Sequence, residues 1–474
     1  MSKNPSLARL ARAMARDHIT VTRQNGVYRF ARADNDHISA EVLLPEGFPI
    51  EKRAVRQLLG FASTHHPHGG RVHRALATPD FHPGDLVPVG SVVATSPDLI
   101  IPQAIGTDIN CGMRLHTADI DLDTFEAHRD TFVEKVRGDL LLGSRDLPIH
   151  TNTMRALLTH GLIGWHESAS ANPLGALIAS DFDQIEGELE RVFRLGSEEG
   201  DVQWAPESLL PTDRDTFRDS YLATVGGGNH FVEIQVVDRI LDGKSAWEWG
   251  VKEGQLAVMV HTGSRSVGRH VGRTWIERSR RRWPSDVRRP ESGITPLYGE
   301  AARSYLSAMQ TAANYGAVNR MLIAELVRLR LREVFGPIEA PLVFDAPHNQ
   351  VFEEGGQLIH RKGATPAHEG DPVLIPGSMG HPSFLLRGLG AKKFLSSASH
   401  GAGRQLSRHE MFRKDRDGED LGLEGVCCIT LKEERRVQEA PVAYKPIQPI
   451  IDVQVEHGIV APVARMRPLL TFKA

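Results

Sequence analysis

The sequence predicts an α+β protein in which strands and helices do not alternate regularly. Candidate strands at 231–237 and 256–260 each adjoin a turn that carries a histidine. Leucines at helical spacing predict a long helix over 319–334, which ends at Gly336-Pro337. The final third returns to strands and turns, so the order differs from the repeated strand–helix pattern of a doubly wound sheet.

The chain of 474 residues is long enough for one large or two ordinary domains. Residues 1–62 predict a small N-terminal appendage with a helix, a hairpin at Asn25-Gly26 and a second helix after Pro49. Residues 63–474 form the expected main domain. It begins with strands and turns between Pro79 and Leu115 and continues with helices and loops over 124–195.

Composition and charge narrow the function classes. Charged residues make up 24% and hydrophobic ones 41%, which is typical of a folded globular protein. A net charge of -3 gives no overall attraction to nucleic acid, so any such site must be a local patch. No apolar run reaches membrane-spanning length, and Cys111, Cys427 and Cys428 form no disulfide framework. We therefore expect a cytoplasmic protein without a membrane partner, with Cys427 and Cys428 buried.

Five potential metal ligands stand in turns or where a predicted strand meets a turn. Asp108 and Cys111 are three residues apart in one turn, close enough to share a metal ion. His230, His261 and His348 each adjoin a strand, and neutral imidazole is the commonest transition-metal ligand. Each group alone is more often structural, for example as a turn cap or a small buried residue. Together they predict a metal centre, and thiolate with imidazole favours zinc over manganese.

Two glycine-rich turns predict an anion site, Pro376-Gly377-Ser378-Met379-Gly380 and His400-Gly401-Ala402-Gly403-Arg404. Small residues let backbone N–H groups approach phosphate oxygens, and Arg404 can clamp one with two hydrogen bonds. His400 is not needed for the metal set. A neutral imidazole beside a metal-bound triphosphate is a competent nucleophile toward phosphorus, whereas the simpler alternative is a turn histidine bonded to backbone.

The strand after Gly226-Gly227-Gly228 carries polar groups on both faces. Because side chains alternate along a strand, Asn229 and Glu233 point one way and His230 the other. This segment can therefore hold a metal on one face and a polar ligand on the opposite face. The simpler alternative is a solvated Glu233.

In combination, these motifs resemble the RtcB family, the manganese- and GTP-dependent RNA ligases. The resemblance covers nearly the whole chain from about Ala62. It implies mixed β-sheets surrounded by helices around a central metal and nucleotide cleft. The matching stretches are Pro79-Asp80-Phe81-His82-Pro83, Gly90 to Val93, Asp108 to Met113, Gly228 to Glu233, His261 to Arg265, His348-Asn349, His360 to Ala367, the Ser378 turn, His400 to Arg404, and Ala443-Tyr444-Lys445.

The resemblance also implies roles for individual residues. Asp108, Cys111 and His230 match the ligands of one manganese, and Cys111, His261 and His348 match those of a second, which replaces the zinc expected from ligand type. His400 matches the histidine that attacks the α-phosphate of GTP and carries GMP. The matching GTP-binding positions are Asn229, His230, Phe231, Val232, Glu233, His348, Asn349, Pro376, Gly377, Ser378, Met379, Ser383, His400, Gly401, Ala402, Gly403 and Lys473.

The implied reaction joins an RNA 3′-phosphate, or a 2′,3′-cyclic phosphate, to a 5′-hydroxyl in tRNA splicing or RNA repair. Arg265, Arg404 and Arg408 are the residues that we expect to hold the RNA phosphate, and an archease-type activator is a further possible partner. Two alternatives stay open. A dinuclear metal-dependent phosphodiesterase needs the metals but not His400 or Lys473, and a non-catalytic RNA-binding paralogue tolerates loss of Cys111.

Some positions depart from the family pattern. Asn110 stands where glycine is usual, although Asn tolerates a left-handed backbone. Thr107 and Thr262 are mild changes near ligands, and His381-Pro382 replaces small residues after the Ser378 turn. A basic run around Trp283 is either solvated surface or a phosphate-binding patch; it contains Arg278, Arg280, Arg281, Arg282, Arg288 and Arg289.

Overall fold

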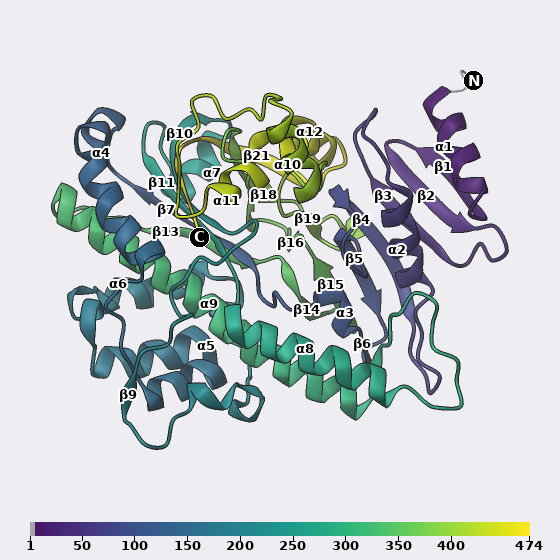
Figure 1. The fold of residues 1–474 in the computed structure, drawn as a ribbon, viewed down its shortest axis with the longest axis horizontal. Coiled ribbons are helices and arrows are strands. Elements are labelled where there is room, and N and C mark those ends of the chain that lie inside the picture. Colours follow the sequence, from purple (N-terminus) through teal and green to yellow (C-terminus); the bar gives the residue numbers. More distant parts are fainter. Residues whose placement is uncertain (1–4) are drawn as a thin grey trace.

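Two β-sheets meet near the centre of the molecule, and helices cover them on the outside (Figure 1). The computed structural model describes residues 5–474. The predicted α+β class is confirmed, because both sheets are largely antiparallel and the helices are distributed irregularly between the strands. Within the described residues, no helix is both long and apolar enough to cross a membrane.

The first sheet has seven strands and includes the N-terminal segment. Its order is β1 (Ile19–Gln24), β2 (Val27–Arg32), β3 (Ser39–Leu43), β4 (Val72–His82), β5 (Val89–Thr95), β15 (Gln357–Lys362) and β14 (Asn349–Glu354). The predicted hairpin is confirmed, since Asn25 and Gly26 have positive φ between paired Gln24 and Val27.

Two helices accompany these N-terminal strands, as predicted: α1 (Pro5–Ala15) and α2 (Lys52–Ala62). Strand β3 pairs with β4 in parallel, so the sheet continues across residue 62. The division of the chain at that residue stays a prediction.

The second sheet has eight strands, and most of the predicted metal ligands lie in it or next to its strands. Its order is β13 (Leu342–Pro347), β7 (Gly112–Ala118), β11 (Leu256–Thr262), β10 (Phe231–Ile240), β21 (Val460–Lys473), β18 (Ser383–Gly388) and β17 (Pro372–Ile375), and β20 (Cys428–Thr430) pairs with β21. The strands predicted at 231–237 and 256–260 are confirmed, and both run further. Cys427 and Cys428 are only half-buried, because β20 lies beside β21 near the surface, so the expectation that they are buried was wrong.

Helix α9 (Glu300–Phe335) is the central helix of the fold. The helix predicted over 319–334 is its C-terminal half, and it ends before Gly336, which has a φ of 85°. Every residue from Thr311 to Arg328 is buried, because α9 packs against the second sheet and three other helices. These are α4 (Leu122–Arg137), α5 (Thr151–Ala171) and α8 (Arg265–Arg282).

Several short elements complete the fold. The C-terminal third contains helices as well as strands and turns, which corrects the expectation: α10 (Arg408–Arg416), α11 (Glu433–Gln438) and α12 (Ile447–Glu456). The others are β6 (Leu99–Ile100), α3 (Pro102–Ile105), β8 (Ile149–His150), α6 (Phe182–Gly187), β9 (Thr216–Phe217), α7 (Gly243–Glu248), β12 (Leu297–Tyr298), β16 (Ala364–Pro366) and β19 (Ser397–Ser399).

A buried network of ion pairs links α9 to the second sheet. Arg320 Nη2 lies 2.8 Å from Asp345 Oδ1, and Arg114 Nη1 lies 3.3 Å from Asp345 Oδ2. Arg320 Nη1 also donates to the carbonyls of Asn110, at 2.6 Å, and Thr262, at 3.2 Å. Those carbonyls adjoin Cys111 and His261, so α9 directly holds the turns that carry two of the predicted metal ligands.

Candidate active site

The metal-ligand residues lie where the ends of four neighbouring strands meet. Cys111 directly precedes β7, His230 directly precedes β10, and His261 lies near the end of β11. In the ladder, Phe231 is opposite His261, and His261 is opposite Met113. His348 stands between β13 of the second sheet and β14 of the first, so the centre lies at the junction of the two sheets.

The five side chains form two groups that share one thiol. Cys111 Sγ lies 3.3 Å from His230 Nε2 and 3.2 Å from His261 Nε2. Asp108 Oδ2 lies 3.0 Å from His230 Nε2, and His348 Nε2 lies 3.2 Å from His261 Nε2. Each group offers three ligand atoms within 4.8 Å of one another, namely Asp108, Cys111 and His230, and Cys111, His261 and His348.

The chemistry of this donor set fits two cations that share the thiolate. Burial and the adjacent Asp108 carboxylate raise the pKa of the Cys111 thiol well above its ordinary value, so ionisation there needs positive charge nearby. Burial opposes ionisation of Asp108 as well, but the His230 ring holds the pKa of that carboxyl below its usual range. Burial lowers the pKa values of His261 and His348, which keeps both rings neutral and able to bind a metal.

His400 lies next to this centre and is oriented by a buried aspartate. Its Nδ1 lies 2.5 Å from Asp80 Oδ2, and its ring centroid is 4.7 Å from that of His348. Burial would raise the pKa of Asp80, but the His400 ring and the Thr78 hydroxyl hold it below its ordinary value. An ionised Asp80 therefore accepts a hydrogen bond from the Nδ1–H group of His400. The Nε2 nitrogen of His400 then carries no proton and is free to react.

The segment that carries Asp80 is fixed from two sides. Lys445 Nζ donates to the carbonyls of Phe81, at 2.6 Å, and Pro79, at 3.3 Å. Gly403 has a φ of 73°, and a Cβ there would lie 2.2 Å from the Asp80 carbonyl oxygen. Glycine is therefore required at 403 for both its backbone conformation and its close contact with Asp80.

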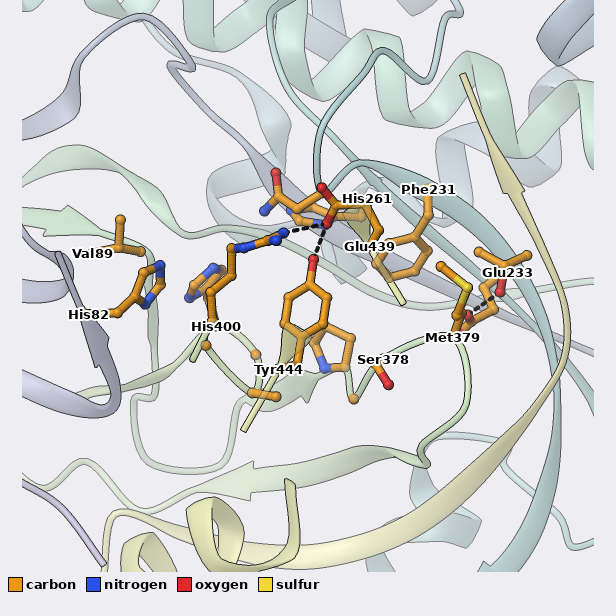
Figure 2. A pocket seen from close by; sticks show the side chains of 18 of the residues that line it. His82, Val89, Phe231, Glu233, His261, Ser378, Met379, His400, Glu439 and Tyr444 are labelled. Atoms are coloured by element: carbon orange, nitrogen blue, oxygen red, sulfur yellow. Dashed lines mark hydrogen bonds and ion pairs between the residues drawn. The ribbon is translucent and has the colours of Figure 1, made fainter. Parts of the chain in front are cut away.

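A cavity of about 300 Å³ extends from His400, which is a volume suited to a small ligand. Figure 2 shows His82 and His400 at one end, Glu233 and Met379 at the other, and Tyr444 between them. The predicted GTP-binding residues that line it are Asn229, Phe231, Glu233, Pro376, Gly377, Ser378, Met379, His400, Gly401, Ala402, Gly403 and Lys473.

Glu233 is a buried acid at the end of the cavity away from His400. Burial raises its pKa to about 7, although Thr471 Oγ1 donates to it at 2.6 Å and Gln235 Nε2 also donates to it. Lys473 Nζ lies 3.3 Å from the carbonyls of Gly228 and His230. Strand β21 thus supplies both the partner of Glu233 and a cation at the cavity wall.

The other predicted GTP-binding residues do not line the cavity. Val232 is in the core, and His230 and His348 belong to the metal groups. Asn349 Nδ2 donates to the Asp108 carbonyl at 2.6 Å, so it supports the turn that carries the metal ligands. Ser383 is buried behind the Ser378 turn, where its hydroxyl accepts from Gln235 and from the Gly377 amide.

The departures from the family pattern have local explanations. Asn110 adopts a φ of 54°, as its left-handed tolerance predicts, and donates to Gln350 Oε1 at 2.7 Å. Thr262 Oγ1 donates to the Val225 carbonyl at 2.6 Å. His381 Nδ1 lies 2.8 Å from Ser378 Oγ, so this histidine shares the hydroxyl expected to contact the guanylate.

The predicted RNA-phosphate arginines occupy different surroundings. Arg404 and Arg408 line the cavity and pair with buried Glu439, at 2.9 Å and 3.3 Å. Arg265 lies outside the cavity at the start of α8, where its Nε donates to Thr224 Oγ1 at 3.0 Å. The basic run around Trp283 begins near the opposite end of α8, a helix length away from Arg265.

Sequence reasoning assigned no role to several residues of the site. Asp80 belongs to a quoted motif, but its contact with His400 joins positions 320 residues apart and has no local pattern. Glu439, which accepts from the Tyr444 hydroxyl, and Thr471 also line the cavity. Neither Glu439 nor Thr471 stands near a glycine-rich turn in the sequence, so no local pattern indicates that they contact a ligand.

The amino-acid sequence of the chain was compared with known protein families and with known proteins. The family model described as tRNA-splicing ligase RtcB matches residues 62–474. The RNA-splicing ligase RtcB of Mycobacterium tuberculosis is 32% identical over 439 residues, which cover 84% of this chain and 96% of that protein. The tRNA-splicing ligase RtcB of Pyrobaculum aerophilum is 33% identical over 442 residues, covering 84% of this chain and 87% of that protein.

A third relative, the tRNA-splicing ligase RtcB of Archaeoglobus fulgidus, is 31% identical over 463 residues, covering 89% of this chain and 91% of that protein. The family match includes the second sheet, all five predicted metal-ligand residues and His400. The chain therefore belongs to the RtcB family.

Proposed function

We propose that this chain is a GTP-dependent RNA ligase that joins RNA 3′-phosphate or 2′,3′-cyclic phosphate ends to 5′-hydroxyl ends. The observation that carries the proposal is the position of His400. It stands between Asp80, which orients it, and His348 of the metal centre, at one end of a cavity of nucleotide size. A hydrolase has no need of an oriented nucleophilic histidine in addition to its metal centre.

In the first step, His400 Nε2 attacks the α-phosphorus of GTP, a nitrogen–phosphorus bond forms, and pyrophosphate leaves. Asp80 accepts a hydrogen bond from Nδ1–H and stabilises the positive charge that develops on the ring. Glu233 is suited to accept hydrogen bonds from the donor edge of guanine, and Lys473 is suited to offset phosphate charge. In this binding mode, the guanine base of GTP lies at the Glu233 end of the cavity and the α-phosphate lies at the His400 end.

In the second step, an oxygen of the RNA 3′-phosphate attacks the phosphorus of the GMP–histidine, and His400 is released. A cyclic phosphate end must first be hydrolysed to the 3′-phosphate. In the third step, the 5′-hydroxyl attacks the activated 3′-phosphorus, a phosphodiester forms and GMP leaves. Arg404 and Arg408 at the cavity wall are suited to hold the RNA phosphate during these transfers.

We propose two manganese ions at the centre, in place of the zinc that thiolate and imidazole favour. Asp108, Cys111 and His230 would hold one ion, and Cys111, His261 and His348 the other. When bound, such ions orient the reacting phosphates and offset their negative charge. A cytoplasmic location and activation by an archease-type protein also belong to this proposal.

A joining assay separates the three candidate functions. An RNA with a 3′-phosphate and one with a 5′-hydroxyl are incubated with the protein, GTP and manganese, beside His400→Ala and Cys111→Ala variants. A ligase forms the joined strand and loses this activity in both variants. A phosphodiesterase cleaves RNA, and still does so in His400→Ala. An RNA-binding paralogue joins and cleaves nothing, and binds RNA equally in all three proteins.

A further inference from the structure

Three consecutive glycines are each faced by an arginine from a different helix. These glycines, Gly226, Gly227 and Gly228, form the glycine loop, which leads into Asn229 and β10. A Cβ on Gly226 would lie 2.0 Å from Arg265 Nη1, and a Cβ on Gly227 would lie 3.1 Å from Arg435 Nη2. A Cβ on Gly228 would lie 3.3 Å from Arg408 Nη2. The guanidinium groups come from α8, α11 and α10, so sequence proximity does not explain their convergence.

The glycine loop is held rigidly by buried groups on its inner side. Asn319 of α9 accepts from the Thr224 amide at 3.1 Å and donates to the carbonyls of Thr224 and Gly263. Lys473 donates to the Gly228 carbonyl. Buried Asn319 thus holds the residue two positions before the glycine loop, and buried Lys473 holds its last residue.

Arg435 has a polar partner but no carboxylate partner among the described side chains. Its Nη1 donates to Gln438 Oε1 at 3.0 Å, and its Nε is buried without a hydrogen-bond partner. Among the side chains that the structure describes, no carboxylate lies within ion-pair distance of Arg435 or Arg265, whereas Arg408 shares Glu439 with Arg404.

Arg435 lies outside the cavity that we assign to GTP. Neither the glycine loop nor Arg265 and Arg435 line the nucleotide cavity, whereas Asn229 and Arg408 do. Of the three arginines, only Arg408 lines the cavity, so the group extends beyond the cavity wall. A polyanion that extends from the cavity along the loop matches this arrangement, because an RNA strand carries a phosphate at every nucleotide.

We infer that Arg435, together with Arg265 and Arg408 over the glycine loop, binds the backbone phosphates of the RNA strand that enters the active site. This inference rests on the proposed RNA ligase function and adds Arg435 to it as an RNA-binding residue. The absence of Cβ atoms leaves room for the guanidinium groups to approach the loop. Contacts of this kind recognise the backbone and not the base sequence.

The test measures binding of a fluorescent single-stranded RNA with a 5′-hydroxyl, across a series of salt concentrations. Arg435→Ala should weaken binding roughly tenfold, as loss of one charge-assisted hydrogen bond does. The slope of log affinity against log salt should fall by about 0.7, the value for one phosphate contact on a single strand. Arg436→Ala is the matched control, because the Arg436 guanidinium pairs with Glu433 at 2.9 Å instead of facing the loop. Equal affinities for Arg435→Ala and Arg436→Ala would overturn the inference.

A second variant tests the same contact without removing charge. Gly227 has no left-handed backbone, so Gly227→Ala should keep the loop conformation, while its Cβ, 3.1 Å from Arg435 Nη2, shifts the guanidinium by a few tenths of an ångström. We expect weaker RNA binding in this variant also, and unchanged binding in a folded Gly227→Ala protein would contradict the inference. Labelling by GTP is measured on every variant: absence of labelling in the native protein defeats the proposed function, whereas normal labelling with unaltered RNA binding defeats only the role of Arg435.

Discussion

Asp80 Oδ2 and His400 Nδ1 lie 2.5 Å apart in the interior of the protein, although 320 residues separate them in the sequence. This contact assigns the two ring nitrogens of His400 different tasks. Nδ1 is engaged by the carboxylate, and Nε2 is free to act on a ligand in the cavity. The account of catalysis rests on that division.

Replacing Asp80 with Asn should slow transfer of GMP to His400 by about 100-fold or more, because an amide does not fix the tautomer or stabilise the charged ring. GTP should still bind with nearly native affinity, since Asp80 does not line the cavity. Single-turnover labelling and equilibrium GTP binding measure the two effects separately. The control is Asp85→Asn at an exposed position nearby. A native labelling rate in Asp80→Asn would refute the positioning role.

GTP affinity should increase with pH up to about 7 and then level off. Burial raises the pKa of Glu233 to about 7, so the free protein carries a neutral acid below that pH. Guanine donors favour the ionised form, and binding must therefore release the proton, which costs up to about tenfold in affinity per pH unit below the pKa. Glu233→Gln should bind more weakly at pH 8 and show no such dependence. The same pH profile in both proteins would rule out Glu233 as the titrating group.

The shared thiol predicts unequal effects of ligand substitutions on metal content. The native protein should bind two manganese ions. His230→Ala and His348→Ala should each bind one ion, and Cys111→Ala should bind both ions more weakly than the native protein does. Manganese titration followed by electron paramagnetic resonance gives these numbers. Cys428→Ala is the control, since this half-buried thiol lies in β20, outside both ligand groups. Two tightly bound ions in Cys111→Ala would show that the thiol is not a common ligand.

The buried ion network predicts a large effect on stability from Arg320. Arg320→Met leaves Asp345 with one arginine partner and removes the donor to the Asn110 and Thr262 carbonyls. The free energy of unfolding of the metal-free protein should fall by about 3–5 kcal/mol. Arg303→Met, at an exposed position of the same helix, should change it by less than about 0.5 kcal/mol. Urea unfolding compares the two, and a similar small change in both would refute a stabilising role for the network.

The sequence alone predicted the local elements that have a clear pattern. The Asn25-Gly26 hairpin, the strands that begin at 231 and 256, and the end of α9 before Gly336 all agree with the structure. The first half of α9 is not evident from the sequence, because its buried residues are mostly small or polar, such as Ala312, Asn314 and Gly316, and give no apolar period. Helix α8 was also missed, although Val267, Val271 and Trp275 have helical spacing, because its end was interpreted only as a basic run.

The site was predictable as a set of motifs but not as an arrangement. The two metal-ligand groups follow the predicted grouping, with Cys111 in both. The sequence gives no indication that His348 joins the two sheets, that Asp80 contacts His400, or that Arg435 lies over Gly227. Each of these depends on pairing between segments far apart in the chain, which only the folded structure determines.

Covalent labelling tests the central claim most directly. The purified protein is incubated with manganese and GTP labelled at the α-phosphate, denatured and examined for acid-labile label, beside His400→Ala. We predict label on the native protein and none on His400→Ala. When an RNA with a 3′-phosphate end is added, the labelled GMP should move from the native protein to that RNA end. An unlabelled native protein with both metals bound and an activating partner supplied, or equal labelling of His400→Ala, would contradict the account.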